Sequence, residues 1–406
     1  MAEIAEPAVV RRASPKDATP ARALAARPAD ALTALSDISA TQWRALSERA
    51  AEPNGYYLPD WELAINASAR GRGGASALGS WSDANELTGL LPVISMWRAY
   101  KIPLPALVSA DPYGSLFTPL LDRDHPEQAA ADILHRARQA GAHALILRDA
   151  SLRGDAMQAF TAVLRRDGIK PRVLQSHVRA ALDARRDADE LLHEALGHKK
   201  LKELRRQRNR LADHGGVDFS IARTPGDVAA AIEIFLKLEA SGWKGKRGTA
   251  LARHEGDAAF IRRATSALAA SGQCEIVTLK AGAVPVAAAI VLRHQDRAFY
   301  FKLGVDEHFS KFSPGVQLTL ELTRHLCADP DIAMADSTAN PDHSMINPIW
   351  RERLAIGDVL IPLRRNDPVT ALVQTALTLR RLAREPARRM VRLIRNHQGN
   401  RQEKPA

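Results

Sequence analysis

The sequence contains only two cysteines, Cys274 and Cys327, among its 406 residues. So few cysteines exclude a disulfide-rich scaffold and a cysteine-based zinc site, and no metal is expected. We expect both side chains to be small buried hydrophobic groups. No apolar run approaches the ~20 residues of a membrane-spanning helix. Aromatic residues are scarce at 5%, but 46% hydrophobic and 25% charged residues are typical of a globular protein with a large core.

The first 33 residues lack the apolar core of a signal peptide. They are rich in Ala, Pro and Arg, which favours a disordered leader and a cytoplasmic protein.

The net charge of +11 comes from two short segments. Residues 199–213 hold seven Lys or Arg against two acids, and residues 364–404 hold eleven against three. The rest of the chain is therefore close to neutral, so a nucleic-acid partner is not expected from the charge alone.

The first basic segment predicts a helix with a thin apolar seam at Leu201, Leu204 and Leu211. It is either a linker helix docked between two domains or a contact to the phosphates of tRNA or of an anionic substrate. The second, residues 366–406, predicts a basic amphipathic helix broken at Pro386. It is either an arginine-rich, partly ordered tail or a contact with an anionic membrane surface, which would place the protein peripherally at the inner membrane.

The stretch from residue 273 to 336 has the clearest pattern. Strands are expected at residues 274–279, 286–292, 298–305 and 332–335, with a helix from Pro314 to about residue 326. In the sequence KFSPG, Ser313 can cap this helix and Pro314 can occupy its first position. A helix that begins at a glycine-bearing turn after a strand presents free backbone N–H groups, which predicts a phosphate or pyrophosphate site.

One order of elements occurs twice along the chain. In the first half we expect helices at residues 34–50 and after Pro59, followed by a hairpin of strands 78–81 and 86–93 and an extended segment 107–121. After these we expect a helix at 126–140, a strand at 143–148, a helix at 155–166 and a strand at 172–182. In the second half we expect helices at 227–241 and 256–270, the stretch described above, then helix 344–353 and strand 355–363. This order predicts a tandem duplication of one mixed α/β domain, covering residues 34–190 and 191–365.

The two halves differ before the equivalent helix. The first half has TPLLDRDHPEQ, which lacks glycine and carries three acids, where the second has KFSPG. We therefore expect only the second half to bind an anionic cofactor.

Several segments together resemble a known superfamily. They cover nearly all of residues 197–363 and are KKLKELRRQRNRL, LEASGWKGKRGTAL, RHEGDAAFIR, AFYFKLGVD and FSPGVQLTLEL. They are similar to Gcn5-related N-acetyltransferases (GNAT) in the duplicated, Fem-like form, and most closely to the acetyltransferase family associated with bacterial cellulose and exopolysaccharide biosynthesis. The resemblance implies tandem GNAT-like domains, mixed central sheets flanked by helices, and acetyl-CoA or another acyl-CoA as cofactor.

The resemblance also implies where the cofactor lies. Its pyrophosphate would contact the backbone of Phe312, Ser313, Pro314, Gly315 and Val316. Where the third strand parts from its neighbour, backbone N–H groups would stabilise the developing oxyanion. The residues expected there are Leu303, Gly304 and Val305.

Four side chains are candidates for catalysis. His254, with Glu255 beside it, suits deprotonation of an amine near neutral pH, or else both residues only cap and solvate a helix start. Lys302 interrupts an aromatic strand and Asp336 ends the neighbouring strand. These two are either a structural ion pair or part of the active site, and the two interpretations are compatible.

Four further residues are candidates for substrate binding. Trp243 and Lys244 follow a helix and could shape the acceptor cleft, or Trp243 closes the helix end against the core. Asp342 and His343 lie in the loop ANPDHSM and could contact substrate, although loop polarity alone also explains them.

The sequence thus predicts an acyl-CoA-dependent acyltransferase. It would transfer an acetyl or other acyl group directly to an amine or hydroxyl of a small molecule, glycan or glycolipid in polysaccharide or cell-envelope metabolism. One alternative is a Fem-like transferase that uses aminoacyl-tRNA, although no long paired-helix arm interrupts the second half. Another is a non-catalytic accessory protein of polysaccharide synthesis.

Overall fold

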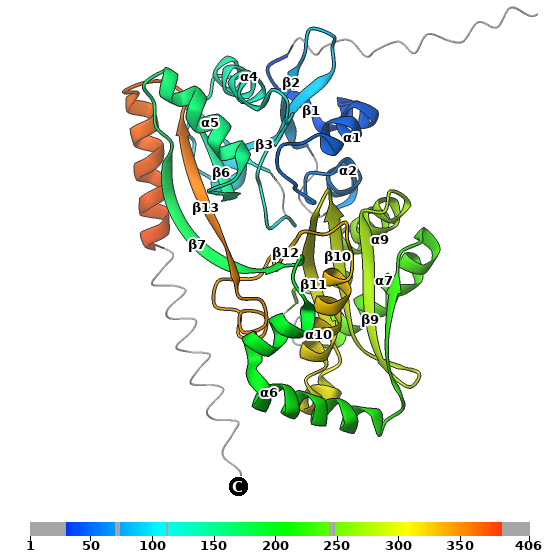
Figure 1. Ribbon diagram of the computed structural model, residues 1–406. Coiled ribbons are helices and arrows are strands. Elements are labelled where there is room, and N and C mark those ends of the chain that lie inside the picture. Colours follow the sequence, from blue (N-terminus) through cyan, green and yellow to red (C-terminus); the bar gives the residue numbers. More distant parts are fainter. Residues whose placement is uncertain (1–29, 70–73, 111–112, 243–244, 246–247, 384–406) are drawn as a thin grey trace, which may run out of the picture.

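A computed structural model describes residues 30–69, 74–110, 113–242, 245 and 248–383. Its centre is one mixed sheet of thirteen strands, counted over these residues, with helices on both faces (Figure 1). Of the expected leader, residues 1–33, only the last four residues are described. Of the expected tail, residues 366–406, residues 368–383 are helical, and residues 384–406, Pro386 included, lie outside the described residues.

The first half contributes the elements at one end of the sheet. They are β1 Thr33–Ala34, the 3-10 helix η1 Leu35–Asp37, α1 Ala40–Glu48, α2 Pro59–Ser68, β2 Ser76–Trp81, β3 Leu87–Ser95, α3 Met96–Tyr100, β4 Ala106–Ser109, β5 Leu120–Leu121, α4 Pro126–Gln139, β6 Ala144–Ser151, α5 Asp155–Arg166 and β7 Arg172–Asp183.

The second half contributes the other end. Its elements are α6 Ala188–Ala212, β8 Val217–Ala222, α7 Pro225–Ser241, η2 Leu251–Arg253, α9 Glu255–Ala270, β9 Cys274–Ala281, β10 Val284–His294, β11 Arg297–Val305, η3 Glu307–Phe312, α10 Pro314–Cys327, β12 Met334–Asp336 and β13 Glu352–Pro362. This mixed α/β architecture confirms the predicted fold class.

The two halves share strands across their junction. The strand order is β1-β2-β3-β4-β6-β13-β7-β12-β11-β10-β9-β8, and β5 pairs with β3. The last strand, β13, therefore lies between β6 and β7 of the first half and is antiparallel to both. At the other end of β7, Leu182 pairs with Ala335 of β12. The long strands β7 and β13 thus join the halves into one sheet, as Figure 1 shows.

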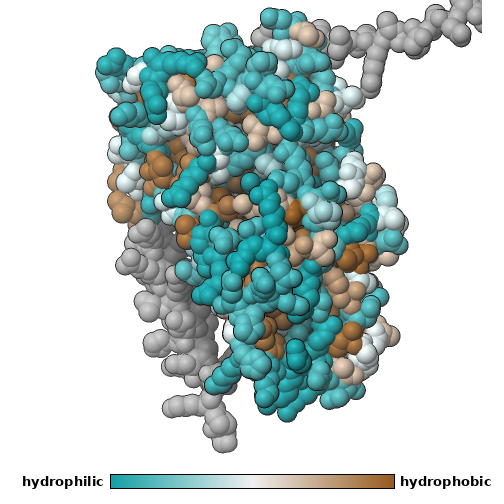
Figure 2. Space-filling view, viewed as in Figure 1, coloured by the Kyte–Doolittle hydropathy of each residue, from teal (hydrophilic) through white to brown (hydrophobic). Residues whose placement is uncertain are grey.

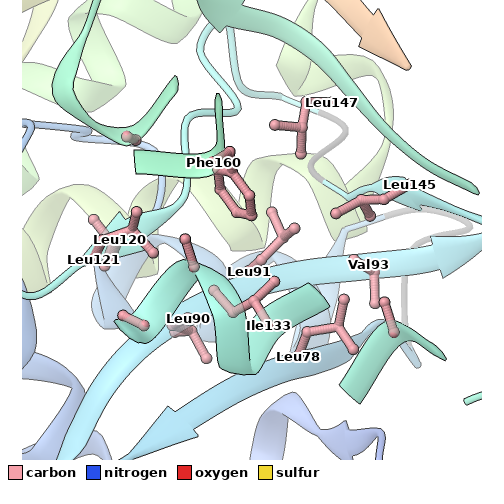
Figure 3. Close-up of a cluster of buried hydrophobic side chains, with 14 of the residues drawn as sticks. Leu78, Leu90, Leu91, Val93, Leu120, Leu121, Ile133, Leu145, Leu147 and Phe160 are labelled. Carbon is pink, nitrogen blue, oxygen red and sulfur yellow. The ribbon is translucent and has the colours of Figure 1, made fainter. Parts of the chain in front are cut away.

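Hydrophobic side chains fill both halves. In the first half, leucines of the sheet pack beneath α4 and α5, with Phe160 among them (Figure 3). In the second half, one cluster lies between the sheet and α7 and α9, and another lies between the sheet and α6 and α10. The helix α2 of the first half belongs to the α9 cluster, where the ring of Trp61 meets that of Phe260 edge-on at 5.0 Å.

A buried histidine ties the halves together. His294, at the end of β10, accepts a hydrogen bond from the Asn54 backbone N–H on Nδ1 (2.8 Å). Its Nε2 lies 2.8 Å from the carbonyl oxygen of Ser47 and donates to it, since a carbonyl oxygen can only accept. Both partners belong to the first half. Burial lowers the pKa of His294 to about 4, so the ring is neutral at physiological pH.

Two predicted helices differ from the structure. The helix expected over residues 34–50 is shorter, because the chain first forms β1 and η1, and the Ser39 side chain caps α1 by accepting from the Gln42 backbone N–H. The helix expected over 344–353 is wrong. Residues 344–349 form turns and β13 begins at Glu352, because Pro348 has no N–H to donate to a helix.

The structure also differs from the predictions in three smaller details. The extended segment expected over 107–121 forms two short strands, β4 and β5. Strand β8 and the short helix α3 were not predicted. Cys274 is buried as expected, whereas Cys327 is only partly buried.

The basic helix α6 packs within the second half. Leu204 and Leu211 are buried in the cluster formed with α10, and Leu201 packs against its edge. Of its basic residues, Arg208 pairs with Glu321 of α10 at 2.6 Å. The others mostly point to solvent, so α6 presents an exposed basic face.

Candidate functional site

The sheet opens at one point in the second half. The parallel strands β11 and β12 pair only from Arg297 to Phe299 on β11. Beyond Phe299, β11 remains hydrogen-bonded to β10 on its other side, with a bulge that leaves Phe301 without a register partner. The chain after β12 turns away, so a notch forms in the sheet, as predicted for the point where the third strand leaves its neighbour.

A cavity of about 620 Å³ occupies this notch. Its walls come from the open part of β11, the segment joining η3 to α10, and the loop after β12. The lining residues are Tyr300, Phe301, Lys302, Leu303, Val305, Asp306, Glu307, Ser310, Ser313, Pro314, Gly315, Val316, Ser337, Thr338, Ala339, Asn340, His343, Met345 and Ile346. Most candidate cofactor residues therefore meet in one cavity.

The start of α10 forms one wall of the cavity. Ser313 is the N-cap residue in a left-handed conformation (φ 53°), and Pro314 takes the first helical position as predicted. The Ser313 hydroxyl makes no capping hydrogen bond, which corrects the expectation that its side chain caps the helix. A helix has no i−4 carbonyl for its first amides, so the N–H groups of Gly315 and Val316 are available to an anion.

Gly315 is in close contact with β11. A Cβ at this position would lie 3.0 Å from Leu303 Cδ2 and 3.3 Å from Val305 Cγ1. The absence of a side chain therefore lets the start of α10 pack closely against β11.

Two of the eight candidate cofactor residues do not line the cavity. Gly304 faces α7, where a Cβ would lie 3.0 Å from the Glu239 backbone nitrogen. Phe312 is buried in the core, with its ring 5.4 Å from that of His214. The alternation of side chains along β11 explains the first case, because Leu303 and Val305 point to the α10 face and Gly304 to the other.

Lys302 pairs with a carboxylate of α7, which packs on one face of β11. Its Nζ lies 3.2 Å from Glu239 Oε1, and the Glu239 side chain is fully buried. The other oxygen, Oε2, accepts from the Leu251 backbone N–H at 2.8 Å. Lys302 therefore does not pair with Asp336, and the proposed Lys302–Asp336 ion pair is wrong. Lys302 faces α7, whereas the α10 wall lies on the opposite face of the sheet, so the cavity reaches both faces.

Asp336 instead pairs with Arg179 of the first half. Both side chains are buried, at 0% and 3% exposure. The Arg179 guanidinium also donates to the Ser115 carbonyl, and the Asp336 Oδ1 accepts from the Thr338 N–H at 2.9 Å. The pair therefore holds β7 and β12 together beneath the notch, and Asp336 does not line the cavity.

The loop after β12 shapes the far wall. Thr338 has a left-handed backbone (φ 49°), and its hydroxyl donates to the Tyr300 carbonyl oxygen at 2.7 Å. The Tyr300 carbonyl oxygen thus has a hydrogen-bond partner although β11 no longer pairs with β12 at this residue. Beneath it lies Tyr56 of the first half, whose pKa is raised by burial and by the nearby Asp336 carboxylate.

The remaining candidates are dispersed. His254 is the N-cap residue of α9 without a side-chain capping bond, and neither it nor the exposed Glu255 lines the cavity. His343 lines the cavity, whereas its exposed neighbour Asp342 does not. Trp243 and Lys244 lie outside the described residues.

The sequence reasoning missed Glu239, and the sequence contained a signal for it. Val228, Ile232, Phe235 and Glu239 follow helical spacing on the buried side of α7. A lone acid on such a face requires a cationic partner. Arg179 had no comparable signal, because its partner lies 157 residues away.

Several solved structures share this fold. FemX is similar over 83% of this chain and 98% of its own, with a TM-score of 0.53 and 12% identity. The C-terminal domain of a protein assigned as a lysylphosphatidylglycerol synthetase from Agrobacterium fabrum covers 83% and 96%, with a TM-score of 0.51 and 12% identity. A conserved protein from Bacteroides thetaiotaomicron covers 80% and 98%, with a TM-score of 0.50 and 11% identity. At these identities the likeness shows the fold.

The mixed α/β fold that the sequence predicted is therefore shared with these solved structures. Residues 198–342 match the family model described as an acetyltransferase (GNAT) domain. This match spans α6 to β12 and contains the notch and the start of α10. No curated protein sequence matches the chain.

Proposed function

We propose that this protein is an acyl-CoA-dependent acyltransferase that acts by direct transfer to an amine or hydroxyl. The observation that carries the proposal is the notch cavity, which reaches the start of α10 on one face of the sheet and Lys302, the partner of Glu239, on the other. A donor and an acceptor can therefore approach the same point from opposite faces.

The residues of the cavity fit an acyl-CoA. The amides of Gly315 and Val316 suit a phosphate, and the apolar side chains of Leu303, Val305 and Ile346 suit an acyl-bearing chain. When bound, the cofactor would supply an activated thioester carbonyl for attack by the acceptor. Asp306 and Glu307 also line the cavity and would disfavour phosphate near their carboxylates, so the phosphates belong at the α10 end.

Lys302 is the proposed electrostatic residue of the site. Its side chain is only 22% exposed, and its ammonium group is held by Glu239 at the open edge of β11. A fixed positive charge in such a place stabilises negative charge that develops on a reacting oxygen. Glu239 acts through Lys302, as a positioning residue.

The acceptor side is proposed to lie toward α7 and α9. A small molecule, glycan or glycolipid of polysaccharide or cell-envelope metabolism remains the proposed acceptor, on the basis of the sequence resemblance. His254 remains a candidate base only if the acceptor extends from the cavity toward the start of α9.

The first half is proposed to have lost cofactor binding. In α4, the equivalent of α10, the residues around the N-terminus include Asp122, Asp124 and Glu127. Asp122 and Glu127 are engaged by Arg49 and Arg166 of the same half. These carboxylates would repel a phosphate at the α4 amides.

One observation favours a second donor. The exposed basic face of α6 lies beside η3 and α10, which form the donor side of the cavity. Such a face can contact the phosphates of an aminoacyl-tRNA, so a Fem-like transferase is the second candidate.

The deciding experiment offers both donors to the purified protein. Labelled acetyl-CoA and charged tRNA are each incubated with amine, sugar and glycolipid acceptors, and loss of donor is measured. Consumption of acetyl-CoA supports the proposal, and consumption of charged tRNA supports the second candidate. If neither donor is consumed and CoA does not bind in calorimetry, a non-catalytic accessory role replaces both.

A further inference from the structure

The helix of residues 368–383 has two faces of different character. On the inner face, Thr370, Val373 and Leu377 are buried against α3, β4, β6 and β13. On the outer side, Leu372, Leu379 and Leu382 are 58%, 60% and 58% exposed. These three leucines are spaced by seven and three residues, so they lie along one side of the helix. We call them the outer leucines.

No charged side chain interrupts the first part of this surface. Residues 369–379 read VTALVQTALTL, without a single acid or base. Figure 2 shows hydrophobic residues at the left edge of the molecule, over the region of this helix in Figure 1. The guanidinium of Arg172 on β7 contacts Gln374 of the helix.

The helix is held firmly enough to present this surface. The Arg380 guanidinium stacks over the Tyr100 ring at 4.6 Å, and Arg381 donates to the Leu174 carbonyl. At its start, Asp367 accepts from the Thr370 backbone N–H at 3.1 Å and contacts His143 Nδ1 at 2.9 Å. The outer leucines are therefore exposed on an anchored helix.

The positive charge of the sequence after this helix indicates what binds to the outer leucines. Residues 384–406 contain seven Lys or Arg and two acids. A binding surface that joins exposed leucines to a basic segment is complementary to a bilayer with anionic headgroups, because the leucines enter the acyl boundary and the cations remain with the phosphates. An acidic protein partner would supply charge but no extended apolar phase.

We propose that the outer leucines and the basic segment after them dock the protein on an anionic lipid surface. One weak signal gives only marginal membrane binding, whereas an apolar contact combined with a basic segment gives stable attachment. The docking helix is separate from the notch, so this inference does not depend on the acyltransferase proposal. Within the described residues no helix is both long and apolar enough to cross a bilayer.

The test is sedimentation of the full-length protein with phosphatidylcholine vesicles, with and without phosphatidylglycerol. We expect binding only to the vesicles with phosphatidylglycerol, and a loss of at least about tenfold in Leu372→Gln/Leu379→Gln/Leu382→Gln. The matched control is Val284→Gln, which removes a 46% exposed hydrophobic side chain from the start of β10 and should bind as the wild type does.

The basic segment is tested separately. Arg388→Ala/Arg389→Ala/Arg392→Ala should weaken binding several-fold, and added salt should weaken wild-type binding in the same way. Equal binding of the leucine variant and the wild type, or no wild-type binding to anionic vesicles, overturns the proposal. Self-association of the wild type that the leucine variant lacks, without vesicle binding, would assign the surface to a second copy of the chain instead.

Discussion

The Nζ of Lys302 lies 3.2 Å from Oε1 of Glu239, at the point where β11 leaves β12. The first prediction concerns this charge. Lys302→Met should lower kcat about 100-fold, the scale of losing one preorganised electrostatic group, and leave donor affinity nearly unchanged. Steady-state kinetics and calorimetry measure the two effects.

Lys302→Arg is the matched control, because it keeps the charge with a different geometry and should retain more activity than the Met variant. Glu239→Gln can still accept from the Leu251 N–H but leaves Lys302 without an anion. Its activity should lie between that of the wild type and Lys302→Met. Full activity in Lys302→Met would remove Lys302 from the mechanism.

The second prediction concerns Gly315. Gly315→Asp should abolish CoA binding, because a carboxylate would face the phosphate at the start of α10. Steric effects also contribute, since any Cβ meets Leu303 and Val305 within 3.3 Å. Gly315→Asn has the same shape without the charge, so it isolates the electrostatic part. Equal CoA affinities of the two variants in calorimetry would refute repulsion, and wild-type affinity in Gly315→Asp would exclude this turn as the phosphate site.

The third prediction concerns the ion pair of Arg179 and Asp336. Breaking a buried pair leaves one charge unpaired, so Arg179→Met should destabilise the protein by about 3–5 kcal/mol. Asp336→Asn should cost a similar amount. The double variant Arg179→Met/Asp336→Asn should lose less than the sum, because no buried charge remains. Urea unfolding of the four proteins measures the coupling, and strict additivity would show that the two side chains act independently.

The fourth prediction concerns pH and His294. Burial lowers its pKa in the folded protein to about 4, below the usual value of 6.5. The unfolded chain therefore binds the proton more readily, and the stability from neutral His294 is present above pH 6.5 and lost as the pH falls toward 4. The expected loss is about 3 kcal/mol over this range.

His294→Gln serves as the comparison, because its amide can accept from the Asn54 N–H and donate to the Ser47 carbonyl without titrating. Urea unfolding of both proteins is measured between pH 7.5 and 4.5. The difference in stability between them at each pH removes the contribution of the carboxylates, which both proteins share. Parallel pH profiles of the two proteins would show that His294 does not govern this range.

Local chemistry made much of the fold predictable. The start of α10 follows from Pro314, which suits the first helical position, and the limits of α5 and β7 follow from periodicity and turn residues. Local reasoning was wrong for residues 344–353, where Pro348 prevents the helix that the repeated order implied. The sequence correctly predicted Ser313 as the N-cap residue of α10. It also predicted a capping hydrogen bond to the Ser313 hydroxyl, which the left-handed backbone of this residue does not allow.

The sequence by itself determined the mixed α/β class, the turn at Ser313–Gly315 and the local origin of the positive charge. These depend on residues close together in the chain. Only the tertiary structure decided that β13 completes the first-half sheet, that Lys302 pairs with Glu239, and that Asp336 pairs with Arg179. The reason is physical: a buried charge takes whichever opposite charge the fold brings within reach, and the partners of Lys302 and Asp336 lie 63 and 157 residues away.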